Sequence, residues 1–357
     1  MADLLKRLDR ISAPDVSAGV DAQRWLDQLT KPPGSLGRLE ELARRLAEIT
    51  GRCPPAVEHP VIFTLAGDHG VVEEGVSAYP QVVTAQMVEN FIRGGAAVNV
   101  LARHAGARVV VADFGVAAPL AEDVSLKAMK IAPGTRNMTR GPAMTRAQAQ
   151  AAVEAGIELV ETERARALDL IGMGEMGIGN TTAASAMVAV FTGAPVGDVT
   201  GQGTGVDGEG RRRKVAAIER ALLVNRPDAN DALDVLAKVG GFEIAGLAGV
   251  ALAGAAYRLP VVVDGFIAGA AALAAVRLAP AARHFLLASH RSAEPGHRHA
   301  LEALGLDPYL DLGMRLGEGT GAALCIDLAR AAVKILTEMA TFKSAGVSAA
   351  GPEVTEA

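Results

Sequence analysis

The sequence is poor in aromatic residues and in cysteine, and each shortage excludes a class of protein. Tryptophan, tyrosine and phenylalanine make up 3% of the 357 residues. The core must therefore consist mainly of alanine, valine, leucine and glycine, which suits close packing of helices on a sheet. The two cysteines, Cys53 and Cys325, form neither a metal-binding spacing nor a disulfide framework. This usage is typical of a reducing compartment.

The chain also lacks a long apolar run and an excess of positive charge. Its alanine-rich segments are interrupted by glycine or charged residues well before the roughly 20 residues that span a bilayer, so we expect no membrane partner. The first residues, MADLLKRLDRISAPD, contain no apolar stretch of the signal-peptide type, which favours a cytoplasmic location. The net charge of -5 argues against nucleic acid as a partner.

Short apolar runs alternate with helical patterns along the chain, and this alternation predicts the fold class. The predicted strands are at 60–66, 108–114, 126–131, 168–171, 259–263 and 284–288. The pattern indicates an α/β protein with a Rossmann-like open, mainly parallel sheet and helices on both faces. We predict a large α/β substrate-binding domain at 52–300, a smaller helical domain from 1–51 and 301–345, and a disordered tail at 346–357.

One stretch, LDLIGMGEMGIGNTTAASAMVAVFT at 168–192, stands at the centre of this pattern. Its composition predicts a strand, a glycine loop and a helix capped by Asn180 or Thr181. The loop is expected to run through Gly172, Gly174, Gly177 and Gly179. The first N–H groups of such a helix have no internal partner, so the turn is a candidate anion site.

Glu175, which lies between these glycines, affects how the loop is interpreted. The spacing of Gly172, Gly174 and Gly177 fits a dinucleotide-binding fingerprint, which would make the protein an NAD-dependent oxidoreductase. A buried carboxylate would repel a pyrophosphate there. The acidic residue expected about 20 positions later is matched only loosely, by Asp198. A tight turn without a ligand is the remaining structural interpretation.

Polar residues follow the predicted strands, where ligands bind in open parallel sheets. They are Asp68, Asp113, Glu175, Asp264 and Ser292. Glu175 and Glu318 each lie between glycines, and paired carboxylates serve glycosidic chemistry, in which positive charge develops on the sugar. With a phosphate cradle at 177–182, the substrate is predicted to be a ribose phosphate with a transferable base. Glu318 has a structural alternative, as an acid favouring the dipole of the following helix.

Three further features have a structural and a functional interpretation. Tyr79 and Gln86 either line an aromatic pocket or have only an ordinary packing role. The run Arg211–Lys214 is a solvated helix face, or one of its cations folds back onto a phosphate. His290, His297 and His299 match no zinc spacing, so we predict no metal.

The sequence resembles the nicotinate-nucleotide–dimethylbenzimidazole phosphoribosyltransferase family over about residues 20–342. The resemblance rests on several motifs in order, which together are far more specific than the glycine pattern alone. The motifs are KPPGSLGRLE at 31–40, AGDHGV and GVSAYPQVVTAQMV within 66–88, GGAAVNVLA at 94–102, GMGEMGIGNTTAASA at 172–186, VVDGFIAGAAAL and ASHRSAEPGH within 262–297, and LDLGMRLGEGTGAAL at 310–324.

The resemblance implies transfer of phosphoribose from nicotinate mononucleotide to 5,6-dimethylbenzimidazole, with inversion. The products would be α-ribazole 5′-phosphate, a precursor of the cobalamin nucleotide loop, and nicotinate. It implies a homodimer that needs no cofactor. A non-catalytic nucleotide-binding sensor, which would bind nicotinate mononucleotide and release nothing, is the alternative outside the enzyme classes.

The same resemblance assigns roles to individual residues. Glu318 would be the general base, Glu175 the second carboxylate, and Lys214 the cation that neutralises the phosphate. The other residues expected at the phosphoribosyl group are Gly177, Gly179, Asn180, Thr181, Asp264 and Ser292. The base pocket is expected at Ala78, Tyr79, Gln86 and Met176.

Overall fold

The computed structural model describes residue 4, residues 7–121 and residues 123–348. Its contacts divide the chain into two units. Of the described residues, those up to Ala13 and those within His59–Ile326 form the larger unit, and those within Pro14–Glu58 and from Asp327 onward form the smaller. Most of the predicted disordered tail, residues 349–357, lies outside the described residues.

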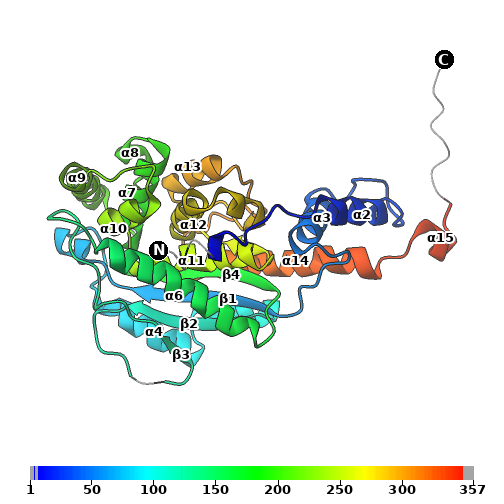
Figure 1. Ribbon diagram of the computed structural model, residues 1–357, viewed down its shortest axis with the longest axis horizontal. Helices are drawn as coiled ribbons and strands as arrows, with labels where there is room; N and C mark the ends of the chain where they lie inside the picture. Colours follow the sequence, from blue (N-terminus) through cyan, green and yellow to red (C-terminus); the bar gives the residue numbers. More distant parts are fainter. Residues whose placement is uncertain (1–3, 5–6, 122, 349–357) are drawn as a thin grey trace, which may run out of the picture. The chain divides into compact units, whose positions relative to one another are not determined.

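The larger unit is built on a parallel sheet with the strand order β3-β2-β1-β4-β5-β6 (Figure 1). Every pair of neighbouring strands is parallel. This order is that of doubly wound dinucleotide-binding folds, in which the chain reverses direction across the sheet between β1 and β4. The strands are β1 Pro60–Gly67, β2 Arg108–Gly115, β3 Leu126–Ala128, β4 Leu170–Met176, β5 Val261–Val263 and β6 Leu286–Ala288. The predicted fold class is confirmed.

Helices cover both faces of this sheet. On one face α11 packs on β1, β2 and β4, with α6 against α11, while α4 packs on the same three strands from the opposite face (Figure 1). The helices of this unit are α4 Val82–Arg93, α5 Ala97–Ala105, α6 Arg146–Arg164, α7 Asn180–Thr192, α8 Val196–Val199, α9 Gly208–Asn225, α10 Ala232–Val239, α11 Phe242–Ala256, α12 Phe266–Leu278 and α13 Pro295–Leu304, with 3-10 helices η1 Gly70–Glu74 and η2 Pro280–Phe285. None of the helices described is long and apolar enough to cross a membrane.

The glycine-rich stretch differs from its prediction, because the strand continues through it. Gly172 and Gly174 lie within β4, and only Gly177–Gly179 form the turn into α7. The two strand glycines serve close packing. A Cβ atom at residue 172 would lie 3.3 Å from the Cβ of Ala322, and one at residue 174 would overlap the carbonyl oxygen of Glu318. The predicted glycine loop is therefore wrong in its first half.

The predicted N-cap of α7 is also wrong. Gly179, with a φ of 94°, is the N-cap, and no side chain caps the helix. Glycine adopts this left-handed conformation without the steric cost of a Cβ. The Asn180 side chain is used elsewhere, since its amide donates to the carboxylate of Glu175.

The smaller unit is helical, and its boundaries differ from the predicted ones. It contains α2 Val16–Leu26, α3 Arg38–Thr50, α15 Phe342–Ala345 and the end of α14 Thr320–Glu338. Residues 301–326 lie in the larger unit instead. They are tied to the sheet by a bridge between His290 and Leu310 and by bonds from the backbone of Gly319 and Ala322 to Asp264.

Candidate active site

A cavity of about 500 Å³ lies in the larger unit, beyond the carboxyl ends of the strands. Met176 at the end of β4, Gly265 after β5 and Ser292 after β6 all line it. Ligands of open α/β sheets bind at this edge. The volume lies within the range of small-molecule sites in proteins. Of the five polar residues predicted at strand ends, Glu175 and Ser292 line the cavity, whereas Asp68, Asp113 and Asp264 do not.

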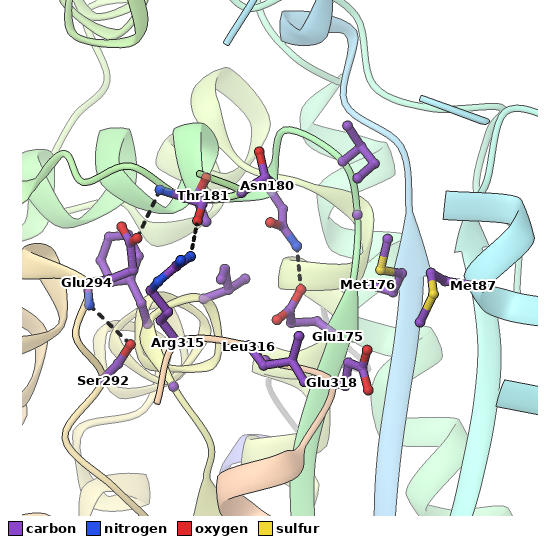
Figure 2. A pocket seen from close by; sticks show the side chains of 18 of the residues that line it. Met87, Glu175, Met176, Asn180, Thr181, Ser292, Glu294, Arg315, Leu316 and Glu318 are labelled. Carbon is purple, nitrogen blue, oxygen red and sulfur yellow. Dashed lines mark hydrogen bonds between the residues drawn. The ribbon is translucent and has the colours of Figure 1, made fainter. Parts of the chain in front are cut away.

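The cavity has two chemically different sides (Figure 2). One side carries two carboxylates together with apolar side chains, namely Glu175, Glu318, Met87, Met176 and Leu316. The other side is polar and is formed by Thr181, Ser292, Glu294 and Arg315. Gly203 belongs to this side, because its backbone is bonded to Glu294 and to Arg315. A ligand that fills the cavity must therefore present an apolar part to the first side and a polar or anionic part to the second.

The backbone at Glu318 is held in an uncommon conformation. Gly317, Glu318 and Gly319 have φ values of 88°, 64° and 98°. A non-glycine residue at positive φ costs free energy, and such strain concentrates at functional sites. The surroundings hold it in place. The Thr64 hydroxyl donates to the Glu318 carbonyl over 3.0 Å, and the Asp264 carboxylate accepts from the Gly319 N–H over 3.1 Å.

This conformation points the Glu318 carboxylate at the cavity while keeping it nearly buried, with 6% of the residue exposed. Its Oε2 accepts a hydrogen bond of 3.3 Å from the backbone N–H of Val98, in the first turn of α5. Burial raises the pKa of Glu318, and the Val98 bond acts in the opposite direction. A carboxylate with a raised pKa is a better base near neutral pH.

Glu175 is buried beside Glu318, with 6% of the residue exposed, and is expected to be protonated at neutral pH. Burial, followed by the charges of Glu243 and Asp264, raises the pKa of Glu175 to about 8. The hydrogen bond from Asn180 acts in the opposite direction, and the charge of Glu318 adds to the increase. The structure therefore pairs a neutral carboxyl group with a more readily ionised one.

This raised pKa predicts a pH-dependent loss of stability. Below its ordinary pKa of 4.5, Glu175 is protonated in the folded and the unfolded chain alike, so it adds no pH dependence. As pH rises from there to about 8, the unfolded chain releases a proton that the folded chain keeps, so the free energy of unfolding falls. Glu175→Gln removes this pH-dependent contribution to stability. The similar contribution of Asp264, whose pKa is raised to about 7, remains.

We therefore expect the melting temperature of Glu175→Gln, relative to the unaltered protein, to increase from about pH 5 to about pH 8. Calorimetry or fluorescence melting across this range measures it. A difference between the two proteins that stays constant with pH would contradict the assignment of Glu175 as the titrating group.

The polar side of the cavity is backed by a buried cation. The Lys214 ammonium donates to the Thr181 hydroxyl over 2.6 Å, and Lys214 is 0% exposed. Burial lowers its pKa to about 8, while the charge of Glu294 acts in the opposite direction. The Arg315 guanidinium donates to the Gly203 carbonyl over 3.0 Å. Two cations and the first turn of α7 thus favour an anionic group at this side.

The structure brings most of the predicted site residues to the cavity wall. Those that line it are Tyr79, Glu175, Met176, Gly177, Asn180, Thr181, Ser292 and Glu318. Those that do not are Ala78, Gln86, Gly179, Lys214 and Asp264. Lys214 lies behind Thr181. Asp264 instead accepts from the backbone N–H groups of Gly319 and Ala322, and so holds the turn that carries Glu318.

Several residues that line the cavity were missed by the sequence predictions. Val83 and Met87 face it from α4, whereas the predicted Gln86 is exposed. The i, i+4 spacing of the two apolar residues is a signal that identifies the inward face of the helix. Arg315 and Leu316 lie within the LDLGMRLGEGTGAAL motif, two or three positions before Glu318. His290 and Glu294 lie in the segment after β6.

The histidines of that segment do not form a metal site in the part of the chain that the structure describes. The rings of His290 and His297 lie 6.2 Å apart. Among the described residues, no three histidine, cysteine, aspartate or glutamate side chains are placed to hold a metal ion. The His297 Nδ1 instead accepts from the Ser292 N–H over 2.9 Å, which fixes the turn after β6.

Comparison with known proteins gives matches over almost the whole chain. A family model described as "Phosphoribosyltransferase" matches residues 11–347. The nicotinate-nucleotide–dimethylbenzimidazole phosphoribosyltransferase of Desulforudis audaxviator is 57% identical over 349 residues, covering 98% of this chain and 99% of the relative. That of Roseiflexus sp. is 57% identical over 348 residues with the same coverage.

The solved structures agree with these relatives. The crystal structure of CobT from Thermus thermophilus superposes with a TM-score of 0.90 at 50% identity, covering 94% of this chain and 100% of that chain. Identity of this extent over almost the whole chain shows that it belongs to the nicotinate-nucleotide–dimethylbenzimidazole phosphoribosyltransferase family.

Proposed function

We propose that the protein transfers the 5-phosphoribosyl group of nicotinate mononucleotide to 5,6-dimethylbenzimidazole with inversion, forming α-ribazole 5′-phosphate and nicotinate. One observation carries this proposal beyond family membership. A single cavity joins a side suited to an anion, with Thr181, Lys214 and Arg315, to a side with two buried carboxylates. A nucleotide phosphate fits the first, and glycosidic chemistry fits the second.

In the proposed reaction, one ring nitrogen of the benzimidazole attacks C1′ of the ribose as the bond from C1′ to the nicotinate nitrogen breaks. The bonding electron pair stays with the nicotinate, whose pyridinium charge is thereby neutralised, so the leaving group needs no acid. The other ring nitrogen of the benzimidazole loses its proton to the carboxylate of Glu318. A base held within reach of that nitrogen is worth about 10² to 10⁴ in rate.

Glu175 is assigned a different part in this reaction. Because its pKa is raised to about 8, it is expected to be neutral at pH 7 and cannot by itself offer a negative charge. A cationic nucleotide bound beside it favours its ionised form. We propose that Glu175, held by Asn180, stabilises the positive charge on the ribose or positions the benzimidazole, while Glu318 takes the proton.

The apolar side of the cavity suits the two flat bases. Met87, Met176 and Leu316 provide the contacts, and Tyr79 lies at the rim with 54% exposure. Methionine adapts its shape to a flat ligand more readily than branched side chains do. We propose this side as the base pocket, with Met87 in the place that the sequence assigned to Gln86.

The oxidoreductase alternative is not favoured by the geometry. Gly172 and Gly174 lie inside β4 rather than in a strand-to-helix turn, so they do not form the dinucleotide loop. Asp198 is exposed in the short helix α8 and follows no strand. The sensor alternative predicts that nicotinate mononucleotide binds without release of nicotinate.

The proposal is tested by turnover of nicotinate mononucleotide with 5,6-dimethylbenzimidazole. We expect chromatography to show nicotinate and an equal amount of an α-linked ribazole phosphate, with the anomer identified by NMR. Release of nicotinate without a new nucleotide would indicate a hydrolase, and binding without release would indicate a sensor. A reaction that requires NADH or NAD and a carbonyl compound would restore the oxidoreductase.

The family resemblance also supports two proposals on the state of the protein. We propose that it is a homodimer and that it acts in the cytoplasm. Light scattering of the purified protein measures the first. A mass equal to one chain of 36.6 kDa would contradict it.

A further inference from the structure

Glu294 is a buried carboxylate at the polar side of the cavity to which neither the sequence nor the proposed reaction assigns a role. It immediately precedes α13, and 5% of it is exposed. Its Oε1 accepts a hydrogen bond of 2.9 Å from the Gly203 N–H. Its Oε2 is buried and has no hydrogen-bond partner in the structure. A carboxylate beside a proposed phosphate site would repel the ligand, so its presence needs a physical reason.

The carboxylate packs closely against the segment formed by residues 201–203, of which Gly203 lines the cavity. A Cβ atom at residue 201 would overlap the Oε2 of Glu294 and lie 2.7 Å from the Cδ of Pro295. On the other side, a Cβ atom at residue 203 would lie 2.7 Å from the Thr181 hydroxyl and 2.8 Å from the Lys214 ammonium. Residues 201–203 therefore lie packed between Glu294 on one side and Thr181 and Lys214 on the other.

Glu294 also acts on the charge of Lys214. Lys214 is completely buried, and its ammonium is bonded to the neutral hydroxyl of Thr181. Burial lowers the pKa of Lys214, and the charge that opposes this effect is that of Glu294. The other cation of this side, Arg315, is bonded to the Gly203 carbonyl. Glu175, Glu318 and His290 face the cavity from its remaining walls.

We propose that Glu294 is a positioning residue for the phosphate of the substrate, which holds residues 201–203 against Thr181 and balances the buried ammonium of Lys214. Its Oε1 accepts the hydrogen bond from Gly203, and its Oε2 is buried. Glu294 therefore acts through residues 201–203 and through Lys214 rather than by touching the ligand. This inference rests on the proposed function, because it takes nicotinate mononucleotide as the ligand whose phosphate lies here.

The proposal predicts a specific pH dependence of binding. Above about pH 7 the phosphate is already a dianion, because its second pKa is near 6. Binding then weakens as Lys214 loses its proton, which occurs near pH 8 in the unaltered protein. Without the charge of Glu294 the ammonium loses its proton at lower pH. Loss of repulsion between Glu294 and the phosphate acts in the opposite direction, but by the same factor at every pH in this range.

The experiment is calorimetric titration of nicotinate mononucleotide, without benzimidazole, into the full-length protein and into Glu294→Gln. Glutamine keeps the shape and can accept the Gly203 bond, so the change is mainly one of charge. We expect the ratio of the variant Kd to the unaltered Kd to grow at least about threefold between pH 7 and pH 8.5. Glu302→Gln, an exposed position on helix α13, which follows Glu294, is the matched control and should give a constant ratio near one.

A second variant separates position from charge. Gly201→Ala forces the segment and the Glu294 side chain apart but keeps the negative charge of Glu294, so we expect weaker binding with no comparable change of the Kd ratio with pH. Circular dichroism confirms that each variant is folded. Nicotinate riboside, which lacks the phosphate, should bind Glu294→Gln and the unaltered protein with a ratio that does not vary with pH.

A ratio for Glu294→Gln that is independent of pH, in a protein that binds nicotinate mononucleotide, would overturn the assigned role in balancing Lys214. Unchanged binding by Gly201→Ala would overturn the assigned role in holding the segment. Failure of the proposed function gives a different result. The unaltered protein would then form no ribazole phosphate or would not bind the nucleotide at any pH.

Discussion

Glu318→Gln is expected to lower kcat for ribazole phosphate formation by about 10² to 10⁴, the usual contribution of a general base. Glutamine has the same shape and can accept the hydrogen bond from the Val98 N–H, but it cannot take a proton from the benzimidazole. The Asp264 carboxylate continues to hold the following turn. The change thus removes the chemistry and leaves the backbone conformation in place.

The measurement is kcat at saturating concentrations of both substrates, together with the Kd of nicotinate mononucleotide by calorimetry. We expect the Kd to change little, because Glu318 lies on the side of the cavity away from Thr181 and Arg315. Glu338→Gln, an exposed glutamate at the end of the helix that follows, is the control and should keep full activity. A variant of Glu318 with near-normal kcat would show that another group takes the proton.

The second large effect is expected at Gly174, where β4 meets the turn that carries Glu318. A Cβ atom at this position would overlap the Glu318 carbonyl and lie 2.9 Å from the Gly319 nitrogen. Both are backbone atoms, which cannot rotate away as a side chain can. Gly174→Ala is therefore expected to lower the free energy of unfolding by about 1–3 kcal/mol, the range for overpacking a close-packed interior.

Activity is expected to fall further than stability. A displacement of about 1 Å at a catalytic group can cost about 10²-fold in rate, and this substitution must move Glu318 or β4. Urea unfolding and kcat measured on the folded variant separate the two effects. Gly197→Ala is the matched control, because a Cβ there meets no atom within 4 Å and the residue lies in helix α8. If Gly174→Ala unfolds at the same urea concentration as that control, the contact between residue 174 and the backbone of Glu318 does not require glycine for stability.

Sequence patterns suffice to predict the parallel sheet, the two glutamates and the family. The parallel sheet follows from buried apolar runs such as β1 and β4, which alternate with helices, because parallel strands need a helical crossover between them. Glu175 and Glu318 are found by their place between glycines, and the motifs around them identify the family. All of these are properties of contiguous segments, in which residues that act together also lie near one another in the chain.

The interpretation of the glycines required the tertiary structure. Gly172 and Gly174 are spaced as in a dinucleotide loop, yet they lie in a strand, because Ala322 and Glu318 occupy the space that side chains would fill. Those partners are about 150 residues away in sequence, so no local pattern contains the information. The same holds for Asn180, whose side chain pairs with Glu175 rather than capping its own helix.

The sequence by itself therefore determined the fold class, the family and the two carboxylates, because local periodicity and contiguous motifs carry them. Only the tertiary structure decided that the pKa of Glu175 is raised to about 8, that Lys214 lies behind Thr181, and that Glu294 accepts a hydrogen bond from Gly203. Burial and the approach of distant charges produce these properties, and both arise only when segments far apart in the chain pack against one another.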